Sequence, residues 1–205
     1  MNPLIKQAFT RIYSEGSWRC GDTNDGTGST VEFAASIMAQ LPPLLRRWGV
    51  TSMLDAGCGE FTWLRHCDLS GITYVGGDVI ADKIQKLRCS FPQHQWIEFD
   101  VTEDPFPLVD VWMSRDTLIH LTNSSIIAAL RNFIKSGITY ALLSHTDWHA
   151  NGDIQNFGEI NHINWYAEPW LIDPALDHCD DFNRKMLLFG RDQISEMLTR
   201  LPSDD

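Results

Sequence analysis

The sequence predicts an α/β protein built on an open, doubly wound sheet. Short apolar runs, each closed by Gly, Asp or Ser, alternate about five times with segments of helical period. Such runs are typical of strands buried in a parallel sheet. The connecting segments are long enough for right-handed crossovers. The five predicted strands lie in TSMLDAG from Thr51, TYVGGDV from Thr73, QWIEFDV from Gln95, VDVWMS from Val109 and TYALLSHT from Thr139.

Two connecting segments, 81–91 and 123–137, have apolar residues spaced three and four apart, which gives one apolar helix face. In the second segment, Asn123 or Ser124 is the expected N-cap, and Gly137 is the expected stop. The apolar stripes are Ile84, Leu87 and Phe91 in the first helix and Ile127, Leu130 and Ile134 in the second.

Less regular segments flank this core. A helical segment precedes it, and in residues 31–48 we expect Pro42 and Pro43 to break the helix. After the core, residues 147–182 have no clean period, and we expect them to form a flap. The amphipathic run RDQISEMLTRL, residues 191–201, predicts a last helix that packs on its own domain or on a twin subunit.

The charge of the chain limits its partners. Lys plus Arg number 16 against 27 for Asp plus Glu, so the formal net charge is 16 − 27 = −11. This sign opposes attraction to phosphate backbones and anionic membranes, so we expect neither a nucleic acid nor a membrane as partner. No apolar run approaches the ~20 residues that cross a bilayer, and the five cysteines form no C-x-x-C pair. We expect a cytoplasmic protein that is a monomer or a homodimer.

The turn after the first strand, LDAGCGEF, narrows the expected ligand. Open α/β sheets bind ligands at the carboxyl ends of their strands. A dinucleotide loop has the pattern G-x-G-x-x-G, but counting from Gly57 and Gly59 its last position is Thr62. The chain also has no G-x-x-x-x-G-K-[ST] phosphate loop. Asp55, two residues before the glycine pair, would repel a pyrophosphate and suit a cationic ligand.

Four motifs together resemble a known family. LDAGCGEF, YVGGDVI, EFDVTED and VWMSRDTLIHL are similar to the successive motifs of the class I S-adenosylmethionine-dependent methyltransferases, in their order and at their intervals. The match covers roughly residues 50–146, and the wider segment from Trp18 resembles a bacterial group of small methyltransferases. The resemblance implies a Rossmann-like fold, S-adenosyl-L-methionine as cofactor and methyl transfer as activity. The third glycine usual in the family is Phe61 here.

On this basis we expect one domain over residues 1–205. Residues 1–48 would form a helical cover, 49–146 the cofactor-binding core, and 147–205 the substrate-side flap with the C-terminal elements. The resemblance also implies where the core meets the cofactor. These positions are Asp55, Gly57 and Gly59 at the methionyl part, Asp78 with Val79 at the ribose, Asp100 with Val101 at the adenine, and the main chain around Ser114 and Arg115 at the methionyl ammonium.

The residues support part of this assignment independently. Asp78 follows Asp55 by 78 − 55 = 23 positions, close to the ~20 expected for a ribose-binding carboxylate. Asp78 and Asp100 could instead cap the turns that follow them. In the amino-terminal segment, Trp18 could shield the cofactor and Arg19 could pair with its carboxylate. Alternatively, this segment is a flexible lead-in whose tryptophan covers the domain edge.

Methyl transfer to a hydroxyl also needs a proton acceptor, and three candidates follow the fourth and fifth strands. Asp116 and His120 follow the fourth strand, and His145 ends the fifth. His120 could equally be a packed helix-face residue. The alternation of His145, Asp147 and His149 would also suit a divalent metal, but the turn residues at 151–153 argue against a continued strand, so we expect no metal.

The acceptor class is narrowed mainly by absent motifs. The chain lacks the N-P-P-[YF] and D-P-P-[YF] stretches of enzymes that methylate nucleic-acid amino groups, and it lacks a proline-cysteine nucleophile. Trp165, Tyr166 and Trp170 could wall a pocket for a small polar molecule or a sugar. We therefore expect methylation of a hydroxyl or carboxylate oxygen on a metabolite. The alternatives are a non-catalytic cofactor-binding module, a nicotinamide-dependent oxidoreductase and a metal-dependent enzyme of the same fold.

Overall fold

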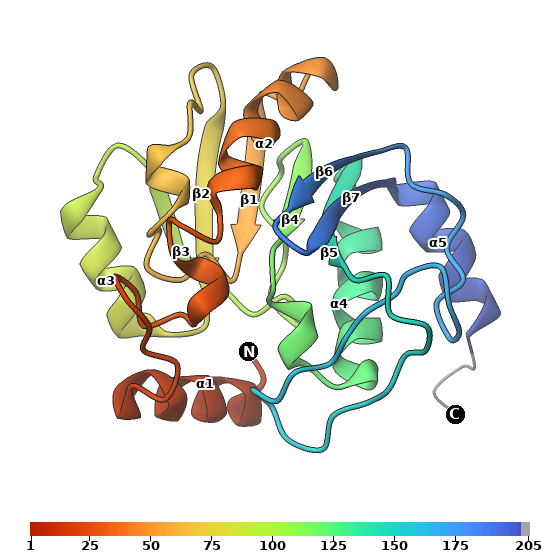
Figure 1. Cartoon of the computed structure of the whole chain (residues 1–205), viewed down its shortest axis with the longest axis horizontal. Helices are drawn as coiled ribbons and strands as arrows, with labels where there is room; N and C mark the ends of the chain where they lie inside the picture. The colour runs from red at the N-terminus through yellow and green to blue at the C-terminus, as the bar shows by residue number, and fades with distance from the viewer. Residues whose placement is uncertain (202–205) are drawn as a thin grey trace.

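The computed structural model describes residues 1–201 and contains a seven-stranded sheet with helices on both faces (Figure 1). The strand order is β3-β2-β1-β4-β5-β7-β6. The first five strands in this order are parallel, and β7 runs antiparallel to both β5 and β6. The strands are β1 (Ser52–Ala56), β2 (Thr73–Asp78), β3 (Gln95–Glu98), β4 (Val111–Ser114), β5 (Tyr140–His145), β6 (Asp177–Asp181) and β7 (Arg184–Gly190).

Two pairs of helices cover the sheet, and a further helix, α1, lies below its carboxyl edge (Figure 1). Helices α2 and α3 share one apolar core with the sheet, and α4 and α5 share the other. None of the helices in residues 1–201 is long and apolar enough to cross a membrane. The helices are α1 (Pro3–Glu15), α2 (Ala35–Arg47), α3 (Ala81–Ser90), α4 (Asn123–Ser136) and α5 (Arg191–Arg200).

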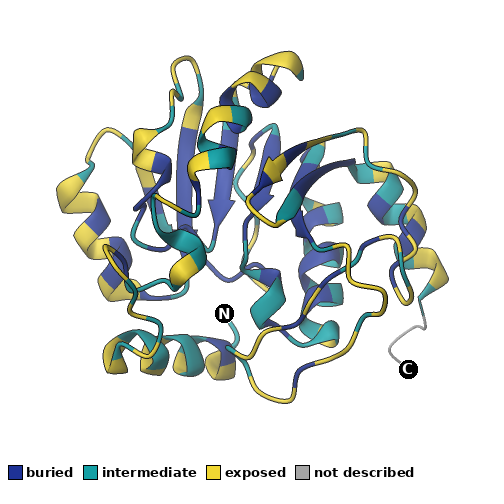
Figure 2. Cartoon of the chain, in the orientation of Figure 1, coloured by how far each residue is buried: buried dark blue, intermediate teal, exposed yellow. Residues whose placement is uncertain are grey.

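The central strands are buried on both faces because successive side chains enter different cores. In β1, Met53 packs with α2 and α3, whereas Leu54 packs with α4 and α5. In β4, Met113 likewise packs with α2 and α3, and Trp112 packs with α4 and α5. Figure 2 shows the result as central strands that are almost wholly buried, whereas exposed residues lie on the outer faces of the helices, on the loops and on β6.

The five predicted strands and the predicted α3, α4 and α5 helices are confirmed. Gly137 ends α4 in the left-handed conformation, with φ of 79°, as expected for a glycine stop. The N-cap of α4, however, is Thr122, whose hydroxyl accepts from the Ser125 N–H, so the prediction of Asn123 or Ser124 was wrong by one or two positions. Ile194 and Met197 of α5 are buried in the core beside α4, so this face packs on its own domain.

The prediction that prolines break the second helix was wrong. Helix α2 continues through Pro42 and Pro43. The φ angle of proline is compatible with a helix, and two missing N–H donors are a local cost. Leu41, Leu44 and Leu45 bury the sheet-facing side of the same helix completely or nearly so, and this burial outweighs the loss.

The residue that replaces the third glycine of the turn adopts the backbone conformation that favours glycine. Phe61 has a φ of 57°, a left-handed value that costs a residue with a Cβ about 1–2 kcal/mol. Its ring is buried and lies 5.0–5.2 Å from the rings of Tyr74, Phe91 and Trp96. The side chain therefore belongs to the apolar core under α2 and α3, and aromatic packing compensates for the backbone strain.

A pair of substitutions at this position separates the two effects. Phe61→Ala should lower the free energy of unfolding by about 3–5 kcal/mol, because it removes a buried ring. Phe61→Gly should be more stable than Phe61→Ala by about 1 kcal/mol, because glycine adopts the left-handed conformation without strain. Urea denaturation of both variants measures the difference. A glycine variant less stable than the alanine variant would contradict the strain argument.

Candidate functional site

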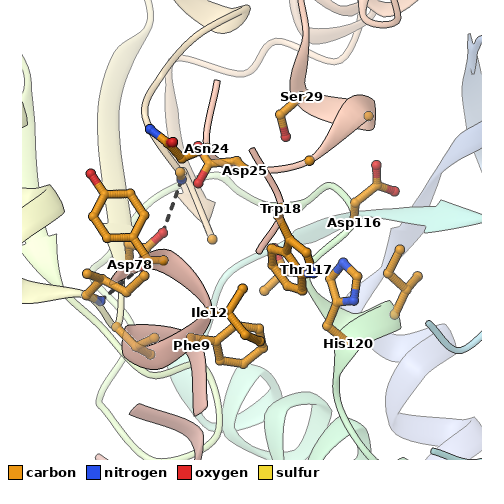
Figure 3. Close-up of a pocket in the computed structure, with 18 of the residues that line it drawn as sticks. Phe9, Ile12, Trp18, Asn24, Asp25, Ser29, Asp78, Asp116, Thr117 and His120 are labelled. Atoms are coloured by element: carbon orange, nitrogen blue, oxygen red, sulfur yellow. Dashed lines mark hydrogen bonds between the residues drawn. The ribbon is translucent and has the colours of Figure 1, made fainter. Parts of the chain in front are cut away.

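A cavity of about 530 Å³ lies at the carboxyl ends of the parallel strands, under the amino-terminal segment. Figure 3 shows Asp78 on one side, Asp116 and His120 on the other, and Phe9 and Ile12 of α1 below. The structure thus brings together most of the residues that the sequence singled out. Those lining the cavity are Trp18, Arg19, Gly57, Gly59, Asp78, Val79, Asp100, Val101, Arg115, Asp116 and His120.

Asp78 ends β2 and links the glycine turn to the start of α3. Its Oδ2 accepts from the Gly59 N–H at 3.2 Å, and its Oδ1 accepts from the Ile80 N–H at 3.0 Å. Ile80 is the N-cap position of α3. Asp78 therefore does both things that the sequence allowed. It stabilises the start of the next helix, and it lines the cavity.

Asp100 follows β3 and holds the beginning of the chain against the sheet. Its Oδ2 accepts from the Asn2 N–H at 2.7 Å, while its Oδ1 accepts from both the N–H and the hydroxyl of Thr102. The side chain is almost fully buried. Asp100 thus stabilises its own turn and anchors the residue before α1, and it also lines the cavity.

An acidic residue that no sequence motif indicated, Asp25, covers the glycine turn. Asp25 accepts from the Glu60 N–H at 2.5 Å and forms an ion pair with Lys83 at 2.6 Å. Lys83 is itself buried and lies 3.5 Å from Asp78. Burial lowers the pKa of Lys83, but the two carboxylates outweigh it and raise the pKa overall. This chain of charges joins the amino-terminal segment to the end of β2.

The two glycines of the turn are needed because protein side chains approach them closely. A Cβ on Gly59 would clash with the Asp25 carboxylate, and a Cβ on Gly57 would clash with the Thr117 hydroxyl. Both glycines have positive φ, 57° and 85° respectively. Asp25 and Thr117 therefore fill the space that the missing side chains leave, so a ligand can meet only the remaining surface of the turn.

Four paired charges form a buried cluster beside the cavity. The Arg115 guanidinium donates to both oxygens of Asp181, at 2.8 and 2.9 Å. Arg184 lies 3.2 Å from Asp181 and 2.5 Å from Asp116. Arg115 also donates to the Gly28 carbonyl at 2.8 Å. Its main ion-pair partner is thus Asp181, with Asp116 at 3.8 Å.

His120 packs against Trp18, with ring centroids 4.4 Å apart (Figure 3). Its Nδ1 is 2.9 Å from the Glu159 carbonyl oxygen. A carbonyl only accepts hydrogen bonds, so Nδ1 carries the proton and Nε2 of the neutral ring has a free lone pair. Burial lowers the pKa of His120, so the ring is neutral at pH 7. It can accept a proton there.

The structure places three predicted residues outside this cavity. Ser114 is buried, and its hydroxyl has no hydrogen-bond partner among residues 1–201. His145 accepts from the Trp165 N–H through Nδ1 and lies 3.1 Å from Asp147 through Nε2, so both ring nitrogens are engaged. Asp55 is buried behind the turn, where its Oδ2 accepts from the Tyr74 hydroxyl at 2.9 Å.

No group of three His, Cys, Asp or Glu side chains within residues 1–201 is placed to hold a metal ion. In the stretch considered for a metal, His145 and Asp147 meet at 3.1 Å. His149 stacks on Trp148 at 5.4 Å instead. The three side chains therefore do not converge, and the geometry gives the metal interpretation no support.

Several solved structures are similar to the chain over nearly all of its length. Magnesium protoporphyrin IX methyltransferase from Synechocystis PCC 6803 has a TM-score of 0.62 at 14% identity, covering 93% of this chain and 100% of that chain. 1,6-Didemethyltoxoflavin-N1-methyltransferase from Burkholderia thailandensis has a TM-score of 0.62 at 12% identity, covering 91% of this chain and 87% of that chain. The N-methyltransferase NodS from Bradyrhizobium japonicum WM9 has a TM-score of 0.61 at 15% identity, covering 91% of this chain and 98% of that chain. The protein has the class I methyltransferase fold.

At these identities the likeness establishes the methyltransferase fold alone. The chain also spans 41% of human N-acetylserotonin methyltransferase and 52% of Streptomyces venezuelae DesVI, about half of each. The TM-scores of those two, 0.47 and 0.46, are too low to support a conclusion. No protein-family model matches the sequence, and no curated protein matches it.

Asp55 should make the stability of this methyltransferase fold depend on pH. Burial raises its pKa to about 7, although the Tyr74 hydroxyl opposes the shift. A raised carboxyl pKa stabilises the fold at low pH, and this stability is lost as pH rises from about 4 to about 7. Asp55→Asn keeps an acceptor for Tyr74 and removes the charge. The difference in unfolding free energy, variant minus wild type, should therefore increase by roughly 2–3 kcal/mol as the pH rises from about 5 to about 7.5.

Asp110→Asn is the matched control, measured by urea denaturation at the same pH values. Burial opposes ionisation of Asp110, but donors from Thr51 and Ser52 hold its pKa below the usual range. Asp110 is therefore fully ionised throughout this pH window, and the stability difference of its variant should stay constant. If the Asp55→Asn difference were equally constant, Asp55 would be ionised over the whole window.

Proposed function

We propose that the protein transfers a methyl group from S-adenosylmethionine to an oxygen atom of a small-molecule acceptor. The observation that carries the proposal is the Asp78 carboxylate, which ends β2 and lines a cavity at the carboxyl edge of a methyltransferase fold. When bound, the cofactor supplies a methyl group on a positively charged sulfur, and the electron pair of the broken carbon–sulfur bond stays on that sulfur. The similar structures include complexes with S-adenosylmethionine and S-adenosylhomocysteine.

The residues of the cavity fit this cofactor in size and chemistry. A volume of about 530 Å³ lies within the roughly 300–1,000 Å³ of small-molecule sites. The Asp78 carboxylate keeps acceptor capacity for ribose hydroxyls, because two oxygens offer about four lone-pair sites. The exposed Arg19 has no ion-pair partner among residues 1–201 and matches a carboxylate. The Trp18 ring offers a face to a cationic sulfur.

The apolar part of the cavity suits the adenine ring. Ile5 and Ile80 line it together with Phe99 and Val101, so a flat heterocycle would contact hydrocarbon on several sides. Asp100 lies beside them and accepts three hydrogen bonds from the protein, which leaves about one lone-pair site for an amino group. We therefore propose that the adenine ring binds in this apolar part of the cavity and that its amino group donates to Asp100.

His120 is the group we propose as general base. Its Nε2 has a free lone pair and the ring is neutral at pH 7, as derived above from the Glu159 contact and the lowered pKa. An acceptor hydroxyl would pass its proton to this nitrogen. Asp116 is held by Arg184 and by the Ser144 hydroxyl at 3.1 Å, so we propose that it orients the acceptor. His145, whose nitrogens are engaged, is not proposed as a base.

The proposal also assigns the segments of the chain. Residues 1–48 would form the cover, residues 49–146 the cofactor-binding core, and residues from 147 onward the acceptor-side flap with β6, β7 and α5. Positions 202–205 of the last segment lie outside the described residues. A non-catalytic cofactor-binding module would share the first two assignments, and turnover experiments separate it from an enzyme.

Cofactor binding should depend on the carboxylate that ends β2. Asp78→Asn should weaken S-adenosylhomocysteine binding by about 10- to 100-fold, because hydrogen bonds to a charged acceptor contribute about 1.5–3 kcal/mol. Isothermal titration calorimetry measures the change. Asp110→Asn is the control, since Asp110 lies at the opposite end of the sheet beside Thr51 and Ser52. Equal affinities in the three proteins, or no binding by wild type, would refute the cofactor assignment.

Turnover should depend on His120 without a matching change in cofactor affinity. His120→Gln should lower kcat by about 100-fold or more, the range of general-base catalysis. It should also abolish the loss of rate that protonation of His120 causes, which lies on the acidic side of the usual histidine pKa of about 6.5 because burial lowers the pKa of this ring. The assay follows methyl-labelled cofactor in the presence of fractionated metabolites. His178→Gln, an exposed histidine on β6, serves as control. A His120→Gln variant with wild-type turnover would exclude this role.

A further inference from the structure

A second hollow of about 390 Å³ adjoins the first cavity, between the carboxyl end of β5 and the flap. Four residues line both spaces, namely Asp116, Ile119, Ile160 and Arg184. A methyl acceptor must meet the methyl donor at close range. The acceptor is therefore expected in a space that shares a wall with the cofactor cavity. This reasoning rests on the function proposed above.

The shared wall combines a fixed ion pair with two apolar side chains. Asp116 is 2.5 Å from Arg184, and its N–H donates to the Ser144 hydroxyl at 2.8 Å. Asp116 also has a φ of 58°, an unusual left-handed value that these contacts stabilise. A carboxylate held in this way has a defined position from which to orient a ligand.

Flat aromatic groups line the outer part of the hollow. The Trp148 ring stacks with two histidine rings, that of His162 at 5.0 Å and 24° and that of His149 at 5.4 Å and 25°. Trp148 is 51% exposed, an unusual exposure for so large an apolar ring. Ile160 is also exposed, and Ile163 closes the inner side. These surfaces suit a flat apolar ring.

The charges around the hollow are already paired. Asp116 faces Arg184, and Asp147 lies 3.3 Å from Lys185 and 3.1 Å from His145. An anionic group such as a phosphate ester would have to compete with these carboxylates for a cation. By contrast, the Asn183 side chain lines the hollow and makes no hydrogen bond within residues 1–201, so it can bind a further polar group of an uncharged ligand.

We infer that the second hollow is the acceptor site and that it takes an uncharged, flat aromatic compound bearing a hydroxyl group. The ring lies against the exposed part of the stack that Trp148 and His162 form, and the hydroxyl points to the wall formed by Asp116 and Arg184. A volume of about 390 Å³ is near the lower end of the roughly 300–1,000 Å³ of small-molecule sites. The acceptor is accordingly small.

Acceptor binding can be measured without turnover. The probes are 2-naphthol, its non-aromatic analogue 2-decalol and the charged analogue 2-naphthyl phosphate, each titrated calorimetrically into the full chain saturated with S-adenosylhomocysteine. We expect 2-naphthol to bind and the two analogues to bind at least about tenfold more weakly. Trp148→Ala should weaken 2-naphthol binding about three- to tenfold, the equivalent of one aromatic contact. Leu108→Ala, which alters a side chain 87% exposed and absent from both linings, is the control.

A parallel assay follows transfer from methyl-labelled cofactor to the three probes. Label transfer to 2-naphthol with little or none to 2-decalol supports the inference. The inference about the acceptor is overturned, and the cofactor assignment stands, if the protein binds S-adenosylhomocysteine but prefers either analogue or binds none of the probes. Equal affinity of wild type and the Trp148→Ala variant for 2-naphthol would overturn it as well. If S-adenosylhomocysteine itself does not bind, the failure belongs to the proposed function.

Discussion

Strands that run parallel must end at the same edge of their sheet, and the arrangement of the whole site depends on this constraint. The ladder of backbone hydrogen bonds fixes β1 against β2 and β4, and β2 against β3. Gly57, Asp78, Asp100 and Asp116 each lie at the end of one of these strands or within a few residues of it. Their relative positions are thus set by the most rigid part of the molecule. Loops adjust the site, but the sheet creates it.

The second determinant is the pairing of buried charge. Arg115, Asp116, Asp181 and Arg184 sum to zero formal charge, and each arginine lies within ion-pair distance of both carboxylates. A buried charge without a partner is strongly destabilising, so the four groups hold one another in place. The cluster joins the end of β4 to the hairpin of β6 and β7, and through the Gly28 carbonyl it also reaches the amino-terminal cover. The wall between the two hollows is one side of this cluster.

The parallel half of the fold could be predicted because its elements are determined locally. Apolar runs closed by Gly or Asp, and helices with a clear apolar stripe, carry their signal within a few residues, as in 73–78 and 123–136. Strand β6 could not be found in this way, since DHCDD contains three aspartates, and aspartate is rare in strands. It is a strand because β7 pairs with it. The apolar run of β7 lies between the flap predicted over 147–182 and the last predicted helix, and no strand was predicted there.

The residues of the candidate site also fall into two groups, those with a local sequence signal and those that only the folded chain brings together. Carboxylates at strand ends follow from the motif positions, whereas Asp25 and Lys83 come together across 58 positions of sequence and have no local signal. The same holds for Arg184, whose role arises from the place of β7 in the sheet. His120 and His145 looked equivalent in the sequence. Their different neighbours, the Glu159 carbonyl for one and Asp147 with the Trp165 N–H for the other, appear only in three dimensions.

The position of β7 also has a consequence for biosynthesis. This strand is the last one along the described chain, yet it lies inside the sheet, between β5 and β6. A ribosome-bound intermediate that has not yet exposed residues 184–190 leaves the long apolar strand β5 as an open edge, able to pair with other nascent polypeptides. Chaperone dependence and losses to inclusion bodies would consequently be governed by the time at which residues 184–190 leave the ribosome.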